Sequence, residues 1–551
     1  MREDFLNLIL AFVFSFVILF LWNHFFPNSK VENQITQEIT QKEINVNEQK
    51  EEDSDFPRVF FKTNSVFGSI NLKGLRFDDL TLSDYQVTTE KNSENVKLLN
   101  SDFMNKYFLE LGLISDDSSL ILPNNQTTWK SDKEELSENC PVTLSYKNKQ
   151  IEVKIKISVD KHYMFNIEKS ITNLSDRSFK VKSYALINKS SKSINSQSKM
   201  SILHEGFIGT VNKKLEEKDY EKIKEEEKKS FYNTEINWLG ITDKYWLTAI
   251  IPDSKFLYNG NYKFGNSNGD GRFQTDILSN TLEIAPQKNV QLNHKLFVGA
   301  KKLDLLDQYE EKYNIKLFDR AIDFGWFYIL TKPIFYFLNF LYKYVGNFGI
   351  SIMLLTVIIK IAMFSLSSKS HRSMQKIKLL APEIENIKKL YANDKQKIHQ
   401  ETILLYKKEK VNPMSGCLPL ILQIPVFFSI YKVLYVTIEM RHADFFGWIN
   451  DLSAPDPSNI FTFFGLFDYQ TPDFLHLGAW PIIMSITMFF QQMLNPKPAD
   501  PTQAIFMKFL PLIFLFMFNN FPAGLLIYWS WSNVLSIIQQ LYINKRSKKS
   551  L

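Results

Sequence analysis

Cysteine is almost absent from this 551-residue chain, which contains only Cys140 and Cys417. Two cysteines are too few for a disulfide framework, and Cys417 adjoins an apolar run, so we do not expect the two to pair. Zinc-ligand spacing, a P-loop, a Rossmann glycine pattern and a G-x-S-x-G motif are also absent. The sequence therefore predicts no cofactor.

Apolar residues are distributed unevenly along the chain. The mean hydropathy of -0.17 is typical of a soluble protein, but it averages two dissimilar parts. Residues 28–320 are rich in Lys, Glu, Asn and Ser, whereas most apolar residues lie before this segment or after it. A chain of this length has room for more than one domain. The distribution predicts a membrane protein with a large polar domain.

The first apolar run, FLNLILAFVFSFVILFLW at residues 5–22, is long enough to cross a bilayer core of about 30 Å. A cleaved signal peptide is the alternative, and it requires a shorter apolar core followed by small residues. The residues that follow here are Asn23, His24, Phe25, Phe26 and Pro27, which form a poor cleavage site. Residues 1–27 are therefore expected to be an uncleaved anchor.

Later runs bring the expected number of spans to six, although the fifth is short. Asn519 and Asn520 separate the last two runs, which we interpret as a tight hairpin. The five later runs are residues 348–366, 418–438, 474–494, 505–518 and 521–543.

The basic residues predict the orientation of these spans, because Lys and Arg are enriched in cytoplasmic loops. They are abundant in the loop between the second and third spans and in the C-terminal tail. The loop between the third and fourth spans contains only Arg441, against five aspartates. Both termini are therefore expected in the cytoplasm, and residues 23–330 outside it.

The external segment divides at residue 56. Residues 28–55 lack a core-forming pattern and are expected to form a flexible linker. Residues 56–325 are expected to form an antiparallel β-sandwich, because apolar and polar residues alternate in short runs separated by Asn-, Ser- and Gly-rich loops. The runs lie at residues 150–160, 179–187, 246–251 and 291–298.

Two features of this domain are candidate functional sites. The charge run KKLEEKDYEKIKEEEKKS at 213–230 mixes both signs, so it favours a solvated helix or loop over a nucleic-acid patch. His162, His204, Glu205 and Asp243 could be assembled into a site, but their spacing does not demand it. We expect no catalytic role here.

Two amphipathic segments flank the second span. Residues 326–346 are expected to form a helix in the membrane interface; the alternative is a continuation of the second span. Residues 370–411 are expected to form a cytoplasmic hairpin of two helices that turns at Asn393 and Asp394. The charged outer face of the hairpin is either solvated or meets anionic lipid or RNA. Its apolar stripe comprises Met374, Ile377, Leu380, Ile384, Ile387 and Tyr391, with Ile398, Leu405 and Tyr406 on the second helix.

Lys360 lies inside the second span, with about 12 Å of helix between it and the cytoplasmic end. A charged side chain near the centre of a span costs about 2.5–3.5 kcal/mol. Snorkelling could recover part of this cost, as expected for Lys432, which lies in the outer half of the third span.

Polar residues in other spans favour a different role for Lys360. Gln423, Gln491, Gln492, Asn533 and Gln539 are all expected in the cytoplasmic half of the membrane. Polar groups at that depth require partners or water. The simplest arrangement is one hydrated cavity that opens to the cytoplasm and is closed toward the outside. A solute transporter using Lys360 would need polar groups along the full depth, and a receptor would need a cytoplasmic output domain.

The chain resembles the YidC family of membrane protein insertases, in the Gram-negative form with a large periplasmic domain. The resemblance lies in long motifs that occur in family order across residues 330–545. These are VGNFG at 345–349, NDKQK at 393–397, LYKKEKVNP at 405–413, GCLPL at 416–420, QIPVF at 423–427, WINDLS at 448–453, FPAGL at 521–525 and Ser532-Asn533.

The resemblance implies a non-enzymatic insertase of the bacterial inner membrane. Residues 347–545 would form the conserved five-helix core, and residues 546–551 a basic cytoplasmic tail. The implied substrate groove comprises Lys360, Gln423, Gln491 and Asn533. In the family the charged position is most often Arg, so Lys360 keeps the charge but loses the bidentate fork.

The resemblance also implies partners. These are nascent membrane proteins, membrane lipids, the Sec translocon and the ribosome, whose RNA the basic tail and the hairpin would contact. The implied contact residues of the hairpin are Lys388, Lys389, Asn393, Asp394, Lys407 and Lys408.

Overall fold

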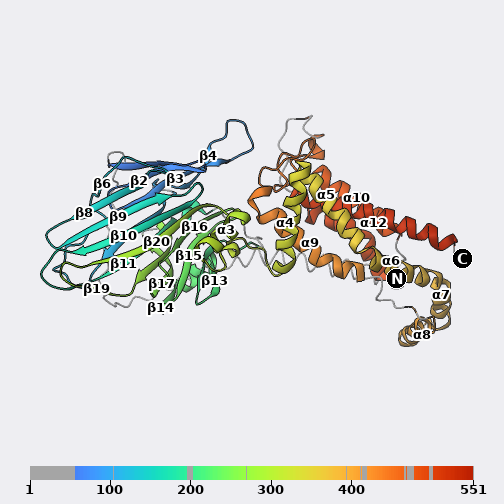
Figure 1. Cartoon of the computed structure of the whole chain (residues 1–551). Coiled ribbons are helices and arrows are strands. Elements are labelled where there is room, and N and C mark those ends of the chain that lie inside the picture. Colours follow the sequence, from blue (N-terminus) through green and yellow to red (C-terminus); the bar gives the residue numbers. More distant parts are fainter. Residues whose placement is uncertain are drawn as a thin grey trace.

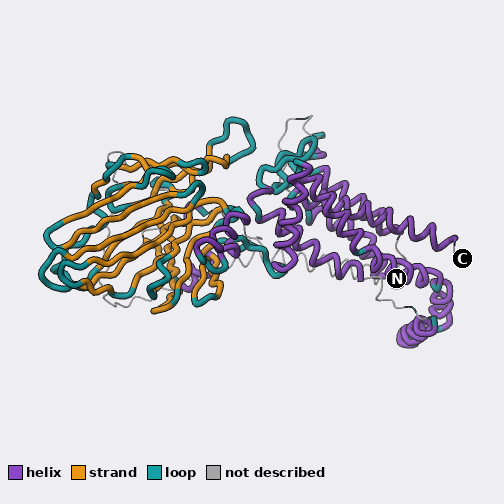
Figure 2. The backbone as a smooth tube through the Cα atoms, in the orientation of Figure 1, coloured by secondary structure: helices purple, strands orange, loops and turns teal. Residues whose placement is uncertain are grey.

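Strands and helices occupy two separate parts of the molecule, which lie side by side (Figures 1 and 2). The computed structural model describes residues 56–102, 105–194, 203–267, 270–392, 394–409, 411, 418–463, 467, 477–494 and 501–549. The expected anchor, the expected linker and Asn393 lie outside the described residues, as do residues 550–551 of the expected basic tail.

Two large sheets form the strand-rich part, and their buried faces contribute to one apolar core. The eleven-stranded sheet has the order β14-β17-β18-β11-β5-β3-β2-β1-β7, with β4 paired to β3 and β19 paired to β11. The nine-stranded sheet has the order β13-β12-β15-β16-β20-β10-β9-β8-β6. Among the described strands the pairs are antiparallel, except for the parallel pair of β1 and β7. The large β-sheet domain expected from the sequence is confirmed.

The strands of the eleven-stranded sheet are β1 (Arg58–Lys62), β2 (Val66–Asn71), β3 (Arg76–Gln86), β4 (Asn95–Leu99), β5 (Tyr107–Ile114), β7 (Glu135–Leu136), β11 (Phe179–Ser190), β14 (Lys228–Thr234), β17 (Tyr258–Ser267), β18 (Asp270–Ser279) and β19 (Leu282–Ile284). Those of the nine-stranded sheet are β6 (Lys130–Ser131), β8 (Val142–Lys147), β9 (Ile151–Val159), β10 (Met164–Asn173), β12 (Gly206–Val211), β13 (Lys214–Asp219), β15 (Ile236–Thr242), β16 (Trp246–Ile251) and β20 (Asn289–Ala300).

β9 shows why alternation predicts these strands. Ile151, Val153 and Ile155 are buried, while the Glu and Lys between them are half-buried or exposed. Apolar side chains thus point to the core on one face, as period two requires. The other three predicted runs fall in β11, β16 and β20, so all four strand predictions are confirmed.

The interpretation of residues 213–230 as a solvated helix or loop is confirmed only for the middle of the segment and was wrong for its two ends. This segment forms β13, the short helix α2 (Tyr220–Glu226) and the start of β14. Tyr220 and Ile223 of α2 are buried, which anchors the segment to the core. β13 and β14 end the strand order of their sheets, and charged side chains suit such edges because they discourage pairing with other chains.

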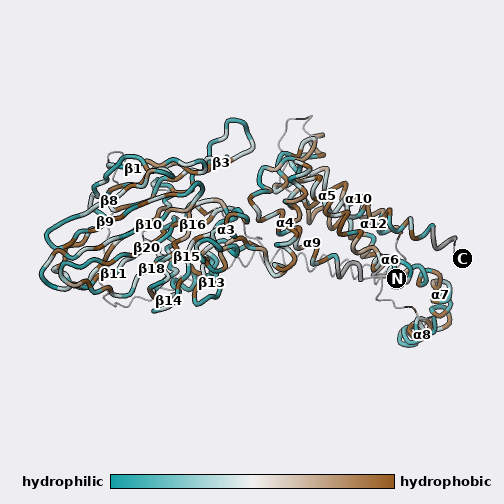
Figure 3. The backbone as a smooth tube through the Cα atoms, in the orientation of Figure 1, coloured by the Kyte–Doolittle hydropathy of each residue, from teal (hydrophilic) through white to brown (hydrophobic). Residues whose placement is uncertain are grey.

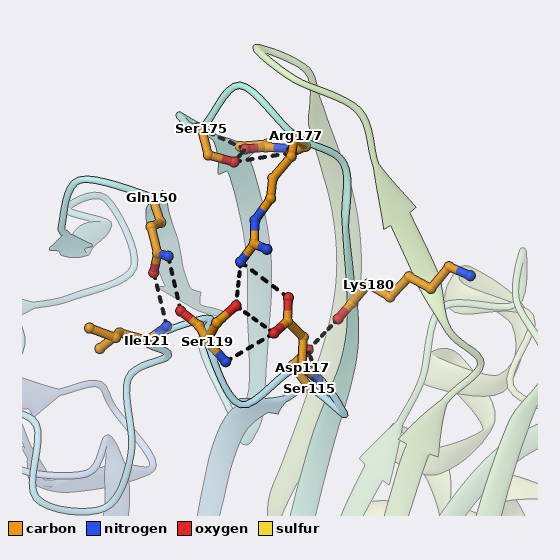
Figure 4. A network of polar contacts seen from close by, with 9 residues as sticks. Ser115, Asp117, Ser119, Ile121, Gln150, Ser175, Arg177 and Lys180 are labelled. Atoms are coloured by element: carbon orange, nitrogen blue, oxygen red, sulfur yellow. Dashed lines mark hydrogen bonds and ion pairs between the residues drawn. The ribbon is translucent and has the colours of Figure 1, made fainter.

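Polar side chains join the loops near β19, at the end of the domain away from the helices (Figures 1 and 4). Gln150 bridges one loop, donating to Ser119 O at 3.0 Å and accepting from Ile121 N at 3.0 Å. Arg177 lies 3.3 Å from Asp117, and hydrogen bonds from Ser119 hold the pKa of Asp117 below its ordinary value. These contacts are exposed, so we assign them to local loop geometry.

The helices are α3 (Leu303–Tyr313), α4 (Tyr328–Val345), α5 (Phe348–Ala362), α6 (Phe364–Leu379), α7 (Ala381–Leu390), α8 (Lys395–Lys408), α9 (Leu418–Val436), α10 (Ala479–Leu494), α11 (Pro501–Met517) and α12 (Ala523–Lys549). Short 3₁₀ turns lie at Ser191–Ser193, Phe318–Ala321, Ile438–Met440 and Ile460–Thr462.

The expected second span is not one straight helix. α5 ends at Ala362, α6 begins at Phe364, and the two are bent by 64°. The composition changes soon after the bend, where Ser, Lys, His and Arg replace the apolar run, and α6 packs against α9 and α12. The hydropathy change is visible in Figure 3, where α5 is largely hydrophobic and α7 and α8 are largely hydrophilic.

Of the helices in the described ranges, none on its own has both the length and the hydropathy of a membrane span; the bent pair α5 and α6 has them together. Shorter apolar helices are Gln423–Val436, Ala479–Leu494 and Ala504–Met517. The count of six spans stays a prediction. α12 continues to Lys549, so the basic tail, expected to be separate from the last span, is partly helical.

α4 is a separate helix and not a continuation of α5. Gly346 ends α4 with a positive φ of 72°, and the side chain of Asn347 caps α5 by accepting from Ile350 N at 3.1 Å. α4 packs against α5 and α9, burying Phe335 and Leu338. Its other side exposes Phe340 and Tyr344, among other aromatic residues, which fits the amphipathic character expected from the sequence.

Lys169 provides a pH-dependent test of the β domain. Its Nζ is buried between the sheets, where it donates to Ser183 Oγ at 2.8 Å and to Gly112 O at 3.3 Å. Burial lowers the pKa of Lys169 to about 7. Between pH 7 and the ordinary Lys value the unfolded chain binds more protons, so the stability contributed by this residue should rise with pH. Below that window the full cost of the buried charge remains.

We expect Lys169→Met to raise the free energy of unfolding at pH 7 by about 1–4 kcal/mol, because an apolar side chain replaces a buried cation. The stability difference between the variant and the wild type should shrink toward pH 10. Thermal unfolding of the full chain in detergent, followed by the β-sheet circular dichroism signal, measures both effects. A variant that is less stable at pH 7, with an unchanged pH slope, would contradict this assignment.

Candidate functional site

The described helices place Lys360 deep in the helical part, facing α12. Asn347 caps the start of α5, and Lys360 lies about 20 Å further along the helix. Its Nζ donates to Ser536 Oγ at 2.9 Å, and Ser536 Oγ donates to Ser532 O at 2.8 Å. Ser536 lies about 20 Å along α12, so the two residues are at matching depths. In the described part of the chain, no carboxylate forms an ion pair with Lys360.

Gln423 also contacts α12, but at a different depth. The Nε2 atom of Gln423 donates to the hydroxyl of Tyr528. Tyr528 lies about 8 Å from the Ala523 end of α12, so this contact is further from the Lys549 end than the position of Gln423 in the sequence indicated. The contacts of Lys360 and Gln423 thus mark two points about 12 Å apart along α12.

Asn533 joins α12 to α10. Its Nδ2 donates to Thr487 Oγ1 at 3.1 Å. Further along the same pair of helices, Gln540 Nε2 donates to Leu494 O at 3.2 Å. Gln491 is half-buried and makes no hydrogen bond to a described residue, whereas the neighbouring Gln492 donates to Met507 O of α11.

α12 therefore brings together three of the four residues expected in the groove. It contacts α5, α6, α9 and α10, and it carries the partners of Lys360 and Gln423 as well as Asn533 itself. Gln491 lies on the adjoining α10 and makes no hydrogen bond to the other three. Four buried polar atoms of α6 and α12 have no hydrogen-bond partner among the described residues: Ser368 Oγ, His371 Nδ1, Ser530 Oγ and Gln539 Nε2.

The sequence analysis missed the residues that hold these side chains. Ser536, Tyr528 and Thr487 were not singled out, although Ser532 and Ser536 are small polar residues four apart in an apolar run. That spacing places them on one face of a helix, where close contact with a second helix is common in membranes. The signal was present, but the partner helix was not identifiable from it.

The expected hairpin is formed by α7 and α8, at the end of the helical part opposite the β domain (Figure 1). Leu380, Ile384 and Val411 are buried together, and Ile377, Leu405 and Tyr406 pack against them. Asp394 caps α8 by accepting from Lys397 N at 2.9 Å. Lys389 pairs with Glu385 at 3.1 Å, Lys388 is half-buried, and Lys407 and Lys408 are exposed.

The apolar contact between the two arms of the hairpin is testable. We expect Ile384→Asn to weaken it by about 2 kcal/mol, because the polar amide has no partner there. Amide hydrogen exchange in α7 and α8 should accelerate, with exchange in the β domain unchanged. Ile403, 39% exposed on α8, supplies the matched control, and Ile403→Asn should leave exchange as in the wild type. Equal effects from both variants would refute the packing role of Ile384.

The residues considered for a catalytic site in the β domain make structural contacts instead. His204 Nδ1 lies 2.6 Å from Asp219, Asp243 pairs with Lys189 at 2.6 Å, and Glu205 accepts from Lys244 N at 2.9 Å. Within the described ranges, no group of three or more His, Cys, Asp or Glu could hold a metal ion.

Two family models together match most of the chain, from residue 58 to residue 550. Residues 58–337 match the family described as the YidC periplasmic domain, and residues 340–550 match the family described as the 60Kd inner membrane protein. The boundary between the two matches falls within α4.

Curated relatives match over nearly the whole length. The membrane protein insertase YidC of Rickettsia akari (strain Hartford) is 52% identical over 560 residues, covering 99% of this chain and 100% of the relative. That of Rickettsia prowazekii (strain Madrid E) is also 52% identical, with the same coverage. A solved structure described as an active YidC insertase with the first transmembrane domain resolved is 16% identical, covers 88% of this chain and 92% of that chain, and has a TM-score of 0.36.

Proposed function

The chain belongs to the YidC family of membrane protein insertases, and we propose that it inserts its substrates through a groove along α12 that contains Lys360. It is an inner-membrane protein with a periplasmic domain, and its activity is non-enzymatic. Its substrates are nascent membrane proteins.

The observation that supports the groove most strongly is the neutral partner of Lys360. Its Nζ donates to Ser536 Oγ and has no carboxylate partner among the described residues. Because the Lys360–Ser536 hydrogen bond joins a cation to a neutral hydroxyl, it lacks the attraction between opposite charges that a carboxylate partner would add. An acidic residue of a substrate would therefore displace the serine hydroxyl with a net gain.

Other polar groups nearby would form hydrogen bonds with the remaining residues of a substrate's polar tail. The buried Nε2 of Gln539 and Nδ1 of His371 have no partner among the described residues, and Gln491 is half-buried without a hydrogen bond. A buried polar atom without a partner costs about 1–3 kcal/mol. Backbone and side-chain groups of a substrate would satisfy these atoms and shorten the polar path across the membrane.

Exposed apolar faces of α9 and α11 would guide the apolar segment of the substrate into lipid. On α9, Ile424 and Phe428 are 44% and 39% exposed. Burial of the substrate segment in lipid drives the reaction, with the membrane potential acting on acidic tails. The exposed apolar residues of α11 include Phe506, Phe509, Leu512, Ile513 and Phe516.

The orientation and the remaining partners belong to the same proposal. Both termini and the α7–α8 hairpin face the cytoplasm, and six spans include the anchor at residues 1–27. Exposed Lys407 and Lys408, with the basic end of α12, suit anionic lipid headgroups or ribosomal RNA, whose phosphates attract cations without sequence preference. The Sec translocon is a proposed partner on the basis of the family resemblance.

Site-specific crosslinking to a stalled nascent membrane protein tests the groove. A photoreactive residue at Gln423 or at Phe506 of α11 should form adducts with the nascent chain. Leu354 is the matched control: it is 39% exposed but lines an apolar pocket with Phe445 and Trp531, so it should form few adducts. The groove is refuted if no adducts form and insertion stays normal after the protein is depleted.

A further inference from the structure

The sequence predicted that Lys432, in the outer half of α9, snorkels to the external interface. The structure shows that it does not. Its side chain is 10% exposed, and its Nζ lies 2.8 Å from Asp323 Oδ2. Asp323 belongs to the segment between the 3₁₀ turn Phe318–Ala321 and α4, where the chain passes from the β domain to the helices (Figure 1). The ion pair therefore joins the β domain to a helix of the core.

Backbone hydrogen bonds hold the carboxylate of Asp323 in place independently of Lys432. Its Oδ2 also accepts from His204 N at 3.0 Å, and its Oδ1 accepts from Gly325 N at 3.0 Å. Burial raises the pKa of Asp323, but the Lys432 charge and these hydrogen bonds outweigh it and hold the pKa below its ordinary value. The carboxylate is thus ionised and oriented toward α9.

Gly325 allows the close approach of the two parts. Its φ is +69°, in the left-handed region that favours glycine, and a Cβ there would lie 3.0 Å from Lys432 Cε. A side chain at this position would be strained and would press on the lysine. Glycine at this position therefore lets the backbone turn lie against the Lys432 side chain.

Further contacts hold the same end of α9 and the loop that follows it. Lys244 Nζ lies 3.8 Å from the centre of the Tyr435 ring, and Tyr245 donates to Ser453 Oγ at 3.2 Å. Arg441 donates to the carbonyl oxygens of residues 86 and 87 in the β domain, at 2.6 and 3.1 Å. All these contacts lie at the outer end of α9, whereas Gln423 lies about 14 Å further in from Lys432.

We propose that Lys432 and Asp323 are positioning residues for insertion: their ion pair lets the β domain fix the outer end of α9 and thereby place Gln423 against α12. This inference rests on the proposed groove only in using α9 as one of its walls. Loss of Asp323 would remove the carboxylate that pairs with Lys432 in a membrane helix, where a cation is unfavourable. α9 would then shift so that the ammonium group reaches water.

The test uses the full chain, with both native cysteines replaced by serine. Disulfide formation between Gln423→Cys and Tyr528→Cys reports the placement of α9 on α12, and insertion of a model substrate is measured in parallel without these cysteines. Asp323→Asn should slow disulfide formation at least fivefold and lower insertion by a similar factor. Lys432→Met should have a weaker effect in the same direction, because it removes the buried cation together with the ion pair, and Lys432→Arg should preserve both readouts.

Asp243→Asn is the matched control, because it breaks another lysine–aspartate pair within the β domain. It should leave both readouts unchanged. The inference is overturned if Asp323→Asn leaves either readout as in the wild type, or if Asp243→Asn has the same effects. If Lys360 proves dispensable while Asp323→Asn still lowers both readouts, the groove assignment fails and the positioning role stands.

Discussion

Replacement of Lys360 by alanine is expected to lower the insertion of substrates with acidic tails about ten- to a hundredfold. A hydrogen bond to a charged group contributes about 1.5–3 kcal/mol, and about 1.4 kcal/mol corresponds to a factor of ten. Ser532, Asn533 and Ser536 of α12 remain in Lys360→Ala, but none of them carries a positive charge. Protease accessibility of the translocated tail in cells depleted of the resident insertase measures the effect.

Two controls make this prediction specific. Lys360→Arg should insert the same substrates normally, because the charge is retained and the guanidinium group adds a bidentate mode. A substrate whose acidic residues are replaced by Asn and Gln should lose little when Lys360 is removed. If Lys360→Ala inserts acidic tails as well as the wild type does, the charge has no role in substrate binding.

Asp456 is expected to have the largest effect on stability among the outer-loop residues. It is 1% exposed, and its Oδ1 accepts from Trp448 Nε1 at 2.9 Å and from the backbone and hydroxyl of Ser458 at 2.9 and 2.7 Å. Its Oδ2 accepts from Trp480 N at 2.8 Å, in the first turn of α10. A carboxylate at a helix N-terminus is also favoured by the helix dipole.

We therefore expect Asp456→Ala to lower the free energy of unfolding by about 3 kcal/mol or more, since partly buried donors on both sides of the loop lose their acceptor. The stability of Asp456→Asn should lie between those of Asp456→Ala and the wild type, because the amide oxygen can still accept some of these hydrogen bonds. Thermal unfolding in detergent, followed by tryptophan fluorescence, measures the difference. Equal melting temperatures for Asp456→Ala and the wild type would show that the loop does not depend on this carboxylate.

The sequence predicted elements well where a short pattern determines them. Alternation along 150–160 predicted β9, and helical spacing around Ile384 predicted the packed hairpin. Charge in the run at 213–230 masked two edge strands, because solvated edges and solvated helices have similar compositions. The bend between α5 and α6 has no proline or glycine to mark it, so its position was not predictable locally.

The site was predicted as a set of polar residues, but not as a set of contacts. Lys360 and Ser536 are 176 residues apart, and Lys432 and Asp323 are 109 residues apart. No local pattern encodes which helix or domain meets another at that separation. The two charges inside apolar helices, Lys360 and Lys432, were therefore visible in the sequence. Only the folded structure shows that Lys360 contacts a neutral serine whereas Lys432 forms an ion pair.

Reconstitution tests the central claim most directly. The purified chain would be placed in liposomes without Sec proteins or nucleotide, and a single-span substrate with a short acidic tail would be added under an imposed membrane potential. We predict that the tail becomes protease-protected in liposomes containing the wild-type chain, and not in liposomes containing Lys360→Ala or in empty liposomes. Protection that is equal in all three would contradict insertion through a groove at Lys360.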